Sequence, residues 1–211
     1  QNRAVTKEDY IARVYSLPGK YGSIAKAYVE RDEQTNLESG ESEFNPLAIN
    51  IYTLSYDADK KLTLSNRATK TNLKTYLQKF RILTDGINLR NAFVINIGVK
   101  FDIIVRPNTI TKEVLIRTIQ ETKKYFQIDR WQINQPILIS DLAATLDQVE
   151  GVQSINNLTI NNLFDLDSGY SGNYYDIQEA IKNNIVYPSL DPSIFELKYP
   201  DTDIEARIIG A

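Results

Sequence analysis

The most regular pattern in the chain is an alternation of apolar and other residues from Phe93 to Val105. A period of two over this length is typical of a β-strand that buries one face. Arg106-Pro107-Asn108 follows directly and predicts the end of the strand. The predicted buried face consists of Phe93, Ile95, Ile97, Val99, Phe101, Ile103 and Val105.

Helical patterns occur both before and after this strand in the sequence. Thr6-Lys7-Glu8-Asp9 is a typical helix start, because a threonine hydroxyl caps free N–H groups and acids favour the positive end of the helix dipole. Leu17-Pro18-Gly19 predicts the end of that helix. The other predicted helices span residues 66–80, 111–126 and 140–150, and in the second of these Leu115, Ile116, Ile119 and Phe126 are expected to face inward.

Shorter apolar runs predict the remaining strands. Residues 24–30 and 47–56 are separated by the polar, acidic segment 31–46, which predicts a long hairpin, and residues 152–160 predict a last core strand. Strands and helices in this order are typical of the α+β class. We expect a two-layer sandwich, in which a mixed or antiparallel sheet carries the helices on one face, and a split βαβ arrangement is a natural candidate.

The character of the chain changes after residue 164. Residues 165–211 are rich in tyrosine and proline, with short extended pieces at 194–199 and 204–209. The sequence therefore predicts a main α+β domain at 1–164. Residues 165–211 are expected to form an extended C-terminal arm or a small β subdomain.

Composition excludes several kinds of chemistry. The 211 residues include no Cys and no His, which excludes disulfides, thiolate metal sites and histidine-based triads. A carboxylate or lysine mechanism stays open on composition alone. The net charge is −3 without a basic run, so we expect no nucleic-acid partner, and no apolar stretch reaches the roughly 18 residues of a membrane span. The chain also contains no Met, so we expect it to be a piece of a longer polypeptide.

Three acidic groups invite a catalytic or metal-binding interpretation. None has the residue spacing of a calcium loop, and acid–base catalysis needs carboxyls in a cleft. We expect the first group below to form a solvated loop, the second an exposed turn and the third a polar loop. We therefore expect no catalytic residue, cofactor or metal. The groups are Asp32, Glu33, Glu38, Glu41 and Glu43; Asp57, Asp59, Lys60 and Lys61; and Asp165, Asp167, Ser168 and Asn173.

The first 30 residues resemble a known family. The run Arg3-Ala4-Val5-Thr6-Lys7-Glu8-Asp9-Tyr10, followed by a helix and by Gly22-Ser23-Ile24-Ala25-Lys26-Ala27, is similar to a segment of baseplate J-like proteins. The order of strands and helices to about residue 164 resembles the carboxy-terminal half of that family, and in particular the baseplate wedge subunit of T-even-type myophages. Those proteins build the baseplates of contractile tails.

The resemblance implies a structural subunit and no catalytic residues. The implied role is self-association through a two-fold contact, and binding to other baseplate wedge proteins. The implied location is the tail baseplate of a virion, with assembly in the host cytoplasm. No nucleic acid or membrane is expected as a partner.

The aromatic residues of the C-terminal segment are the predicted interface. Aromatic side chains bury a large area with few rotatable bonds, which suits them to interface anchoring. The alternative is that they fold back on their own domain. We also expect that the segment Ile194–Tyr199 can add a strand to the sheet of a neighbour. The predicted interface residues are Tyr170, Tyr174, Tyr175, Tyr187, Phe195 and Tyr199.

An alternative function is a non-viral α+β binding module that holds peptide or nucleic acid on its sheet. Such a module needs basic and aromatic residues on the open sheet face. The second face of the long strand lacks them, since it carries Val94, Asn96, Gly98, Lys100, Asp102 and Ile104. A carboxylate-based hydrolase has no motif to support it.

Overall fold

The computed structural model describes residues 3–31, 48–81 and 86–209 of the chain. They fold into two compact units, unit 1 (Gln1–Ala92) and unit 2 (Phe93–Ala211). Each unit combines helices with a mixed sheet, so the predicted α+β class is confirmed, with two main sheets where one was expected.

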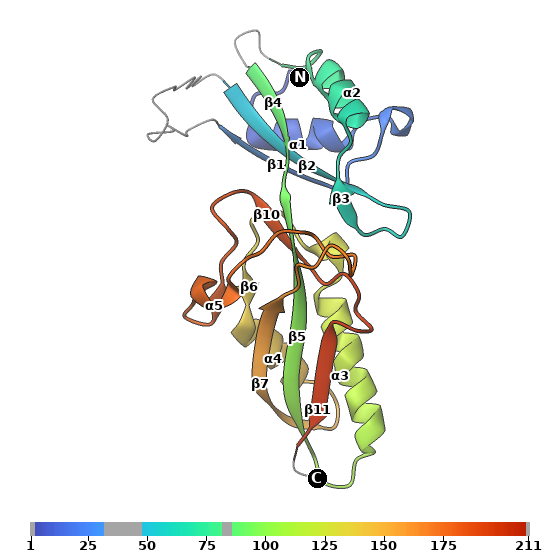
Figure 1. The fold of residues 1–211 in the computed structure, drawn as a ribbon, viewed down its shortest axis with the longest axis vertical. Coiled ribbons are helices and arrows are strands. Elements are labelled where there is room, and N and C mark those ends of the chain that lie inside the picture. Colours follow the sequence, from blue (N-terminus) through green and yellow to red (C-terminus); the bar gives the residue numbers. More distant parts are fainter. Residues whose placement is uncertain (1–2, 32–47, 82–85, 210–211) are drawn as a thin grey trace. The chain divides into compact units, whose positions relative to one another are not determined.

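The sheet of unit 1 is built around one central strand. Strand β2 pairs antiparallel with β1 and β3 and parallel with β4, as Figure 1 shows. In this register Val29 lies opposite Ile51, and Ile51 lies opposite Leu89. The elements of unit 1 are α1 (Lys7–Tyr15), η1 (Gly19–Tyr21), β1 (Lys26–Arg31), β2 (Ala48–Tyr56), β3 (Leu62–Leu64), α2 (Arg67–Leu77) and β4 (Gly86–Asn91).

The start of α1 follows the prediction closely. The Thr6 hydroxyl accepts a hydrogen bond from the Asp9 N–H at 3.1 Å, and the Asp9 carboxylate accepts one from the Thr6 N–H at 3.0 Å. This reciprocal pair is a capping box, which satisfies two donors that a helix end leaves free. The Asp9 carboxylate also accepts from the Val5 N–H at 3.0 Å, and these two backbone donors, Thr6 and Val5, hold the pKa of Asp9 below its usual value. The role expected for Thr6 is therefore confirmed.

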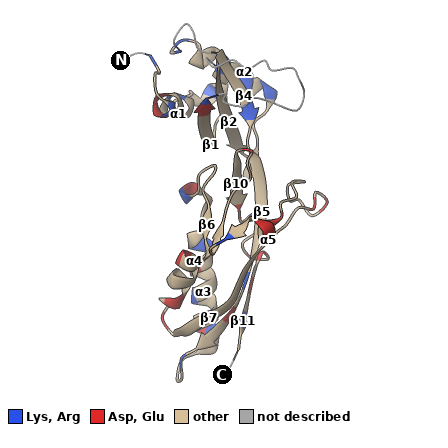
Figure 2. Cartoon of the chain, turned by 90° about the vertical axis from the view of Figure 1, so that its left-hand side faces the viewer, with Lys and Arg blue, Asp and Glu red and all other residues tan. Residues whose placement is uncertain are grey.

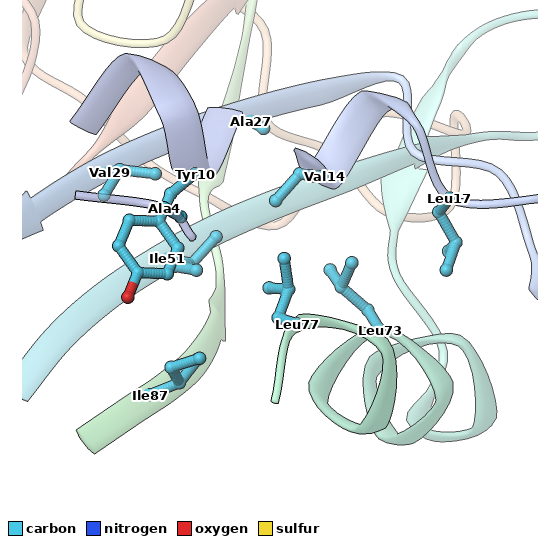
Figure 3. Packing of buried hydrophobic residues seen from close by; sticks show 10 residues of the cluster. All are labelled: Ala4, Tyr10, Val14, Leu17, Ala27, Val29, Ile51, Leu73, Leu77 and Ile87. Carbon is cyan, nitrogen blue, oxygen red and sulfur yellow. The ribbon is translucent and has the colours of Figure 1, made fainter. Parts of the chain in front are cut away.

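Two helices cover one face of the unit 1 sheet. Figure 3 shows Tyr10 and Val14 of α1 and Leu73 and Leu77 of α2 gathered against Ile51 of the central strand. All five side chains are completely buried. Burying a side chain of this size stabilises the fold by roughly 1.5–3 kcal/mol, so this cluster holds the two layers together.

Unit 2 is also built around one central strand, and the predicted strand from Phe93 to Val105 is confirmed with these limits. A small additional sheet has the strand order β6-β9-β8. The helices of unit 2 are α3 (Thr111–Tyr125), η2 (Ile128–Arg130), α4 (Ile139–Asp147) and α5 (Ile177–Ala180). Its strands are β5 (Phe93–Val105), β6 (Ile137–Leu138), β7 (Val152–Asn162), β8 (Ile181–Lys182), β9 (Ile185–Val186), β10 (Ser193–Glu196) and β11 (Ile204–Ile208).

The two edges of β5 bind different parts of the chain. The N–H groups of Phe93 and Val99 donate to the segments that begin β10 and β11, both parallel to β5. The carbonyl of Asn96 accepts from the Leu163 N–H, on the side of the antiparallel strand β7. Because successive residues of a strand point their backbone groups to alternate edges, β10 and β11 share one edge and β7 holds the other.

The C-terminal segment belongs to the body of unit 2. Strands β10 and β11 lie within residues 165–211, and both pair with β5. The expected boundary after residue 164 therefore does not coincide with the division into compact units, which falls between Ala92 and Phe93. The extended piece at Ile194–Tyr199 contributes its strand to the chain's own sheet instead of extending freely.

Helices α3 and α4 pack against the β5 sheet, and α3 buries a different stripe from the one expected (Figure 1). The buried residues of this helix are Val114, Thr118 and Thr122, whereas Ile116 is 54% exposed. The prediction that Ile116 faces inward was wrong. The hydroxyls of Thr118 and Thr122 donate to the carbonyls of Val114 and Thr118 one turn earlier, which satisfies them inside the core.

Candidate interaction surfaces

The six predicted interface residues fall into two groups. Phe195 is 1% exposed on β10 and belongs to the core of unit 2, while Tyr170, Tyr175 and Tyr199 are partly buried against their own unit. Tyr174 and Tyr187 are exposed, at 67% and 45%. The structure therefore leaves the last two available for a partner and uses the other four mainly in internal packing.

Tyr170 and Tyr199 are held by a buried carboxylate. The Tyr170 hydroxyl donates to Asp203 at 2.6 Å, the Tyr199 N–H donates to the same side chain at 2.7 Å, and the two tyrosine rings meet edge to face. Burial and then the bond to Asp203 raise the pKa of Tyr170 to about 12. The phenol is therefore protonated and donates this hydrogen bond throughout the neutral range.

The segment that follows Tyr170 is fixed to β5 by polar contacts. The Asn96 side chain accepts from the Ser171 N–H at 2.7 Å and donates to Glu196 at 2.8 Å, and all of these atoms lie within unit 2. The carbonyl of Val94 accepts from both the Ser171 hydroxyl and the Asn173 amide. These contacts position the residues on either side of Tyr174 while its ring stays exposed.

Exposed apolar side chains gather around Tyr174. Its ring meets Phe164 edge to face at 5.1 Å, and Tyr174 and Phe93 line an open groove of about 310 Å³. Tyr187 joins this region because its carbonyl accepts from the Tyr175 hydroxyl at 2.7 Å. We call the exposed residues of this region the aromatic surface: Phe93, Phe164, Tyr174, Tyr187 and Leu190.

Acidic side chains border the aromatic surface. Asp191 lines the same groove as Tyr174, and the Tyr174 hydroxyl donates to Asp176 at 3.5 Å. Asp165 also lies beside Phe164 in the sequence, and hydrogen bonds from Ser168 and from the Asp167 N–H lower its pKa. The Asp165 carboxylate is therefore charged at neutral pH, and the surface combines aromatic rings with acidic side chains.

The open end of the unit 2 sheet carries paired charges. Lys100 contacts Glu205 at 2.9 Å across β5 and β11, and Arg207 contacts the buried Asp102 at 3.2 Å. Asp102 also accepts from the Asn157 amide at 2.7 Å. Acids and bases are equal in number here and satisfy one another, so this face offers little free charge to a partner.

The acidic groups considered for chemistry serve local structure where the structure describes them. Asp57 accepts from the N–H groups of Asp59 and Lys61 in the turn between β2 and β3, and Asp165 accepts from the Asp167 N–H. Within the described residues, no group of three or more acidic side chains is placed to hold a metal ion. The five acids between residues 32 and 43 lie outside the described residues.

No helix in the described part of the chain is both long enough and apolar enough to cross a membrane.

Comparison with known proteins gives a fold-level match. No family model matches the chain, and no curated protein matches it. Among solved structures, the chain is similar to a chain of the anti-feeding prophage baseplate, determined by cryo-EM with 6-fold symmetry. The TM-score is 0.52 at 12% sequence identity, and the match covers 99% of this chain and 38% of that chain. The structural neighbour is thus a prophage baseplate protein, and this chain corresponds to about two fifths of its length.

Part of the aromatic surface was not predicted from the sequence. Phe93 was assigned to the buried face of the long strand, yet it is 44% exposed at the strand's first position. Leu190 is fully exposed between Ser189 and Asp191, where no periodic pattern surrounds it. The signal that was available was the isolated leucine itself, placed in a polar, proline-flanked loop.

Proposed function

We propose that this chain is a structural subunit of a contractile tail baseplate, specifically of the wedge, and that it has no enzymatic role. The observation that carries the proposal is the fold match to a prophage baseplate protein over 99% of this chain. The motif from Arg3 to Tyr10 supports it independently, because it resembles baseplate J-like proteins at the level of sequence.

In this proposal the subunit functions by holding its contact surfaces at fixed positions. Each two-layer unit has a closely packed core, which keeps its surface groups at fixed positions. The aromatic surface of unit 2 is a suitable contact region, because aromatic side chains are common anchors at interfaces. We propose that the chain binds copies of itself through a two-fold contact, and that it binds other wedge proteins in the tail baseplate of a virion assembled in the host cytoplasm.

Antibody labelling of tail particles tests this proposal. Antibodies raised against the purified chain are applied to intact tails from the organism that encodes it, and gold-conjugated secondary antibodies are located by electron microscopy. The proposal predicts gold at the distal end of the tail. Gold confined to the tail shaft, or a chain that is abundant in the lysate and absent from purified tails, would contradict it.

A further inference from the structure

Helix α2 of unit 1 carries an unusual excess of positive charge. Residues 60–84 contain seven Lys and Arg and no Asp or Glu. Three of these cations, Arg67, Lys74 and Lys79, are exposed on or just after the helix, and Lys70 is partly exposed. Figure 2 shows the Lys and Arg colour on α2 without the colour of Asp and Glu.

Among the residues that the structure describes, Arg67, Lys70, Lys74 and Lys79 have no acidic partner. The contrast is α3 of unit 2, where Arg117, Lys123 and Lys124 each form an ion pair with a nearby carboxylate. No such pair involves the α2 cations. Their charge is therefore available to a second molecule.

An exposed aromatic residue lies beside α2. The Asn72 amide donates to the Tyr21 carbonyl at 3.1 Å, which places η1 next to the helix. Tyr21 is 42% exposed, and the Lys20 ammonium lies 4.9 Å from its ring centre. We call this group the basic surface: Lys20, Tyr21, Arg67, Lys70, Lys74 and Lys79.

The region around the aromatic surface of unit 2 has the opposite character. Residues 163–197 contain six Asp and Glu against one Lys. Glu179 and Asp191 are exposed, and neither carboxylate has a partner among the described residues. Figure 2 shows the Asp and Glu colour at α5, where Glu179 lies. Unpaired acids and exposed rings therefore occur together.

We propose that the basic surface of one copy of this chain binds the aromatic surface and its acidic border on a second copy. This inference rests on the proposed function, because it specifies the self-association of the subunit. Lysine and arginine are attracted both to carboxylates and to the faces of aromatic rings. Tyr174 and Tyr187 supply such rings, and Glu179 and Asp191 supply the carboxylates.

The pairing is compatible with the two-fold contact proposed above. Each copy carries both surfaces, so a two-fold axis applies the same contact twice, with the basic surface of each copy on the acidic surface of the other. Opposite charges also steer the encounter, which makes association faster at low ionic strength. The contact is therefore expected to weaken as salt is added.

Charge reversal on the two surfaces tests the pairing. The first variant combines Arg67→Glu with Lys74→Glu, the second combines Glu179→Lys with Asp191→Lys, and the third carries all four changes. Sedimentation velocity of the purified chain over a range of concentrations gives the dissociation constant of each. We expect each two-site variant to associate at least about tenfold more weakly than the parent chain, and the four-site variant to recover within about threefold, because it restores opposite charges.

Controls separate this effect from misfolding and from net charge. Lys112→Glu reverses an exposed charge at the start of α3 and is expected to leave the dissociation constant unchanged. Asp191→Asn removes the charge without reversing it, and its effect is expected to be smaller than that of Asp191→Lys. Circular dichroism of every variant establishes that the fold is retained.

Three results would overturn the inference. They are a parent chain that stays monomeric at every concentration, a four-site variant as weak as the two-site variants, and a parent chain that binds a duplex oligonucleotide through Arg67 and Lys74 without self-association. The proposed function is judged separately, because gold labelling at the tail end is independent of these results. Labelled tails with a monomeric chain would remove the proposed self-association and this inference, and would leave the assignment to the baseplate standing.

Discussion

The hydroxyl of Tyr170 donates a 2.6 Å hydrogen bond to the buried carboxylate of Asp203. The two residues join the loop after β7 to the start of β11, which pairs with the central strand β5. Asp203 also accepts from the Tyr199 N–H, and its own carbonyl accepts from the Val99 N–H. These contacts, together with the pairing of β10 and β11 with β5, tie residues 165–211 to unit 2.

Removing the Tyr170 hydroxyl is expected to destabilise unit 2. In Tyr170→Phe, the buried carboxylate of Asp203 loses one of its donors, and leaving a buried acceptor undersatisfied costs about 1–3 kcal/mol. Trp131 is the only tryptophan of the chain and lies in unit 2, where it is buried. Its fluorescence during urea unfolding therefore measures the decrease in the free energy of unfolding.

The matched control is Tyr174→Phe. The Tyr174 hydroxyl is 3.5 Å from Asp176 at an exposed position, so its removal is expected to change the free energy of unfolding by less than about 0.5 kcal/mol. Equal effects of the two substitutions would show that the Asp203 contact does not anchor the C-terminal segment.

Local sequence patterns predicted most elements of this fold. Residues with strong periodicity, such as the alternation from Phe93 to Val105, gave the central strand with its observed limits. Capping chemistry at Thr6 gave the start of α1, because a cap depends on a few adjacent residues. In these cases the determining interactions are close in sequence.

Long-range pairing could not be read in the same way. Ile194 pairs with Val94, and Ile204 pairs with Val99, across about a hundred residues, and no local pattern in either partner specifies the other. Strand β4 is six residues long and interrupted by Asn88 and Arg90, so it was not predicted as a strand. Without β4, the division after Ala92 could not be recognised.

The interface prediction was limited by the same cause. Aromatic composition identified the segment that carries Tyr174, but it could not separate Tyr174, which is exposed, from Phe195, which is in the core. That difference depends on the pairing of β10 with β5. The cations of α2 were overlooked because they are spaced along a helix instead of forming a continuous run.

Alkaline pH is expected to destabilise the fold in a defined range. Burial is the largest cause that raises the pKa of Tyr52, Tyr125 and Tyr170 to about 12, from an ordinary value of 10.0. Because the folded state binds these protons more tightly than the unfolded state, their contribution to stability is complete below pH 10 and is lost as the pH rises towards 12.

Two measurements check this pH dependence. Tyrosinate absorbance is expected to show a group of tyrosines that titrates later in the folded chain than in urea, and the melting temperature is expected to fall between pH 10 and pH 12. If all 13 tyrosines titrate together near the ordinary value while the fold is intact, the burial assigned to these three phenols is incorrect.

The capping box is expected to stabilise α1. Thr6→Ala removes the acceptor for the Asp9 N–H, and the loss of a threonine cap typically costs about 1 kcal/mol. Hydrogen exchange of the α1 amides measures the change within unit 1. Thr71→Ala is the control, because Thr71 is an exposed residue inside α2 whose hydroxyl bonds only to the Arg67 carbonyl in the same helix. Comparable losses of protection in both variants would argue against a specific cap.

The central claim is that this chain is built into a baseplate. The most direct measurement is a cryo-EM reconstruction of intact tail particles from the organism that encodes it. The account predicts density for both units at the distal end of the tail, in several symmetry-related copies, with Tyr174 and Lys74 at contacts between chains. A well-resolved baseplate whose density is fully assigned to other proteins would contradict it.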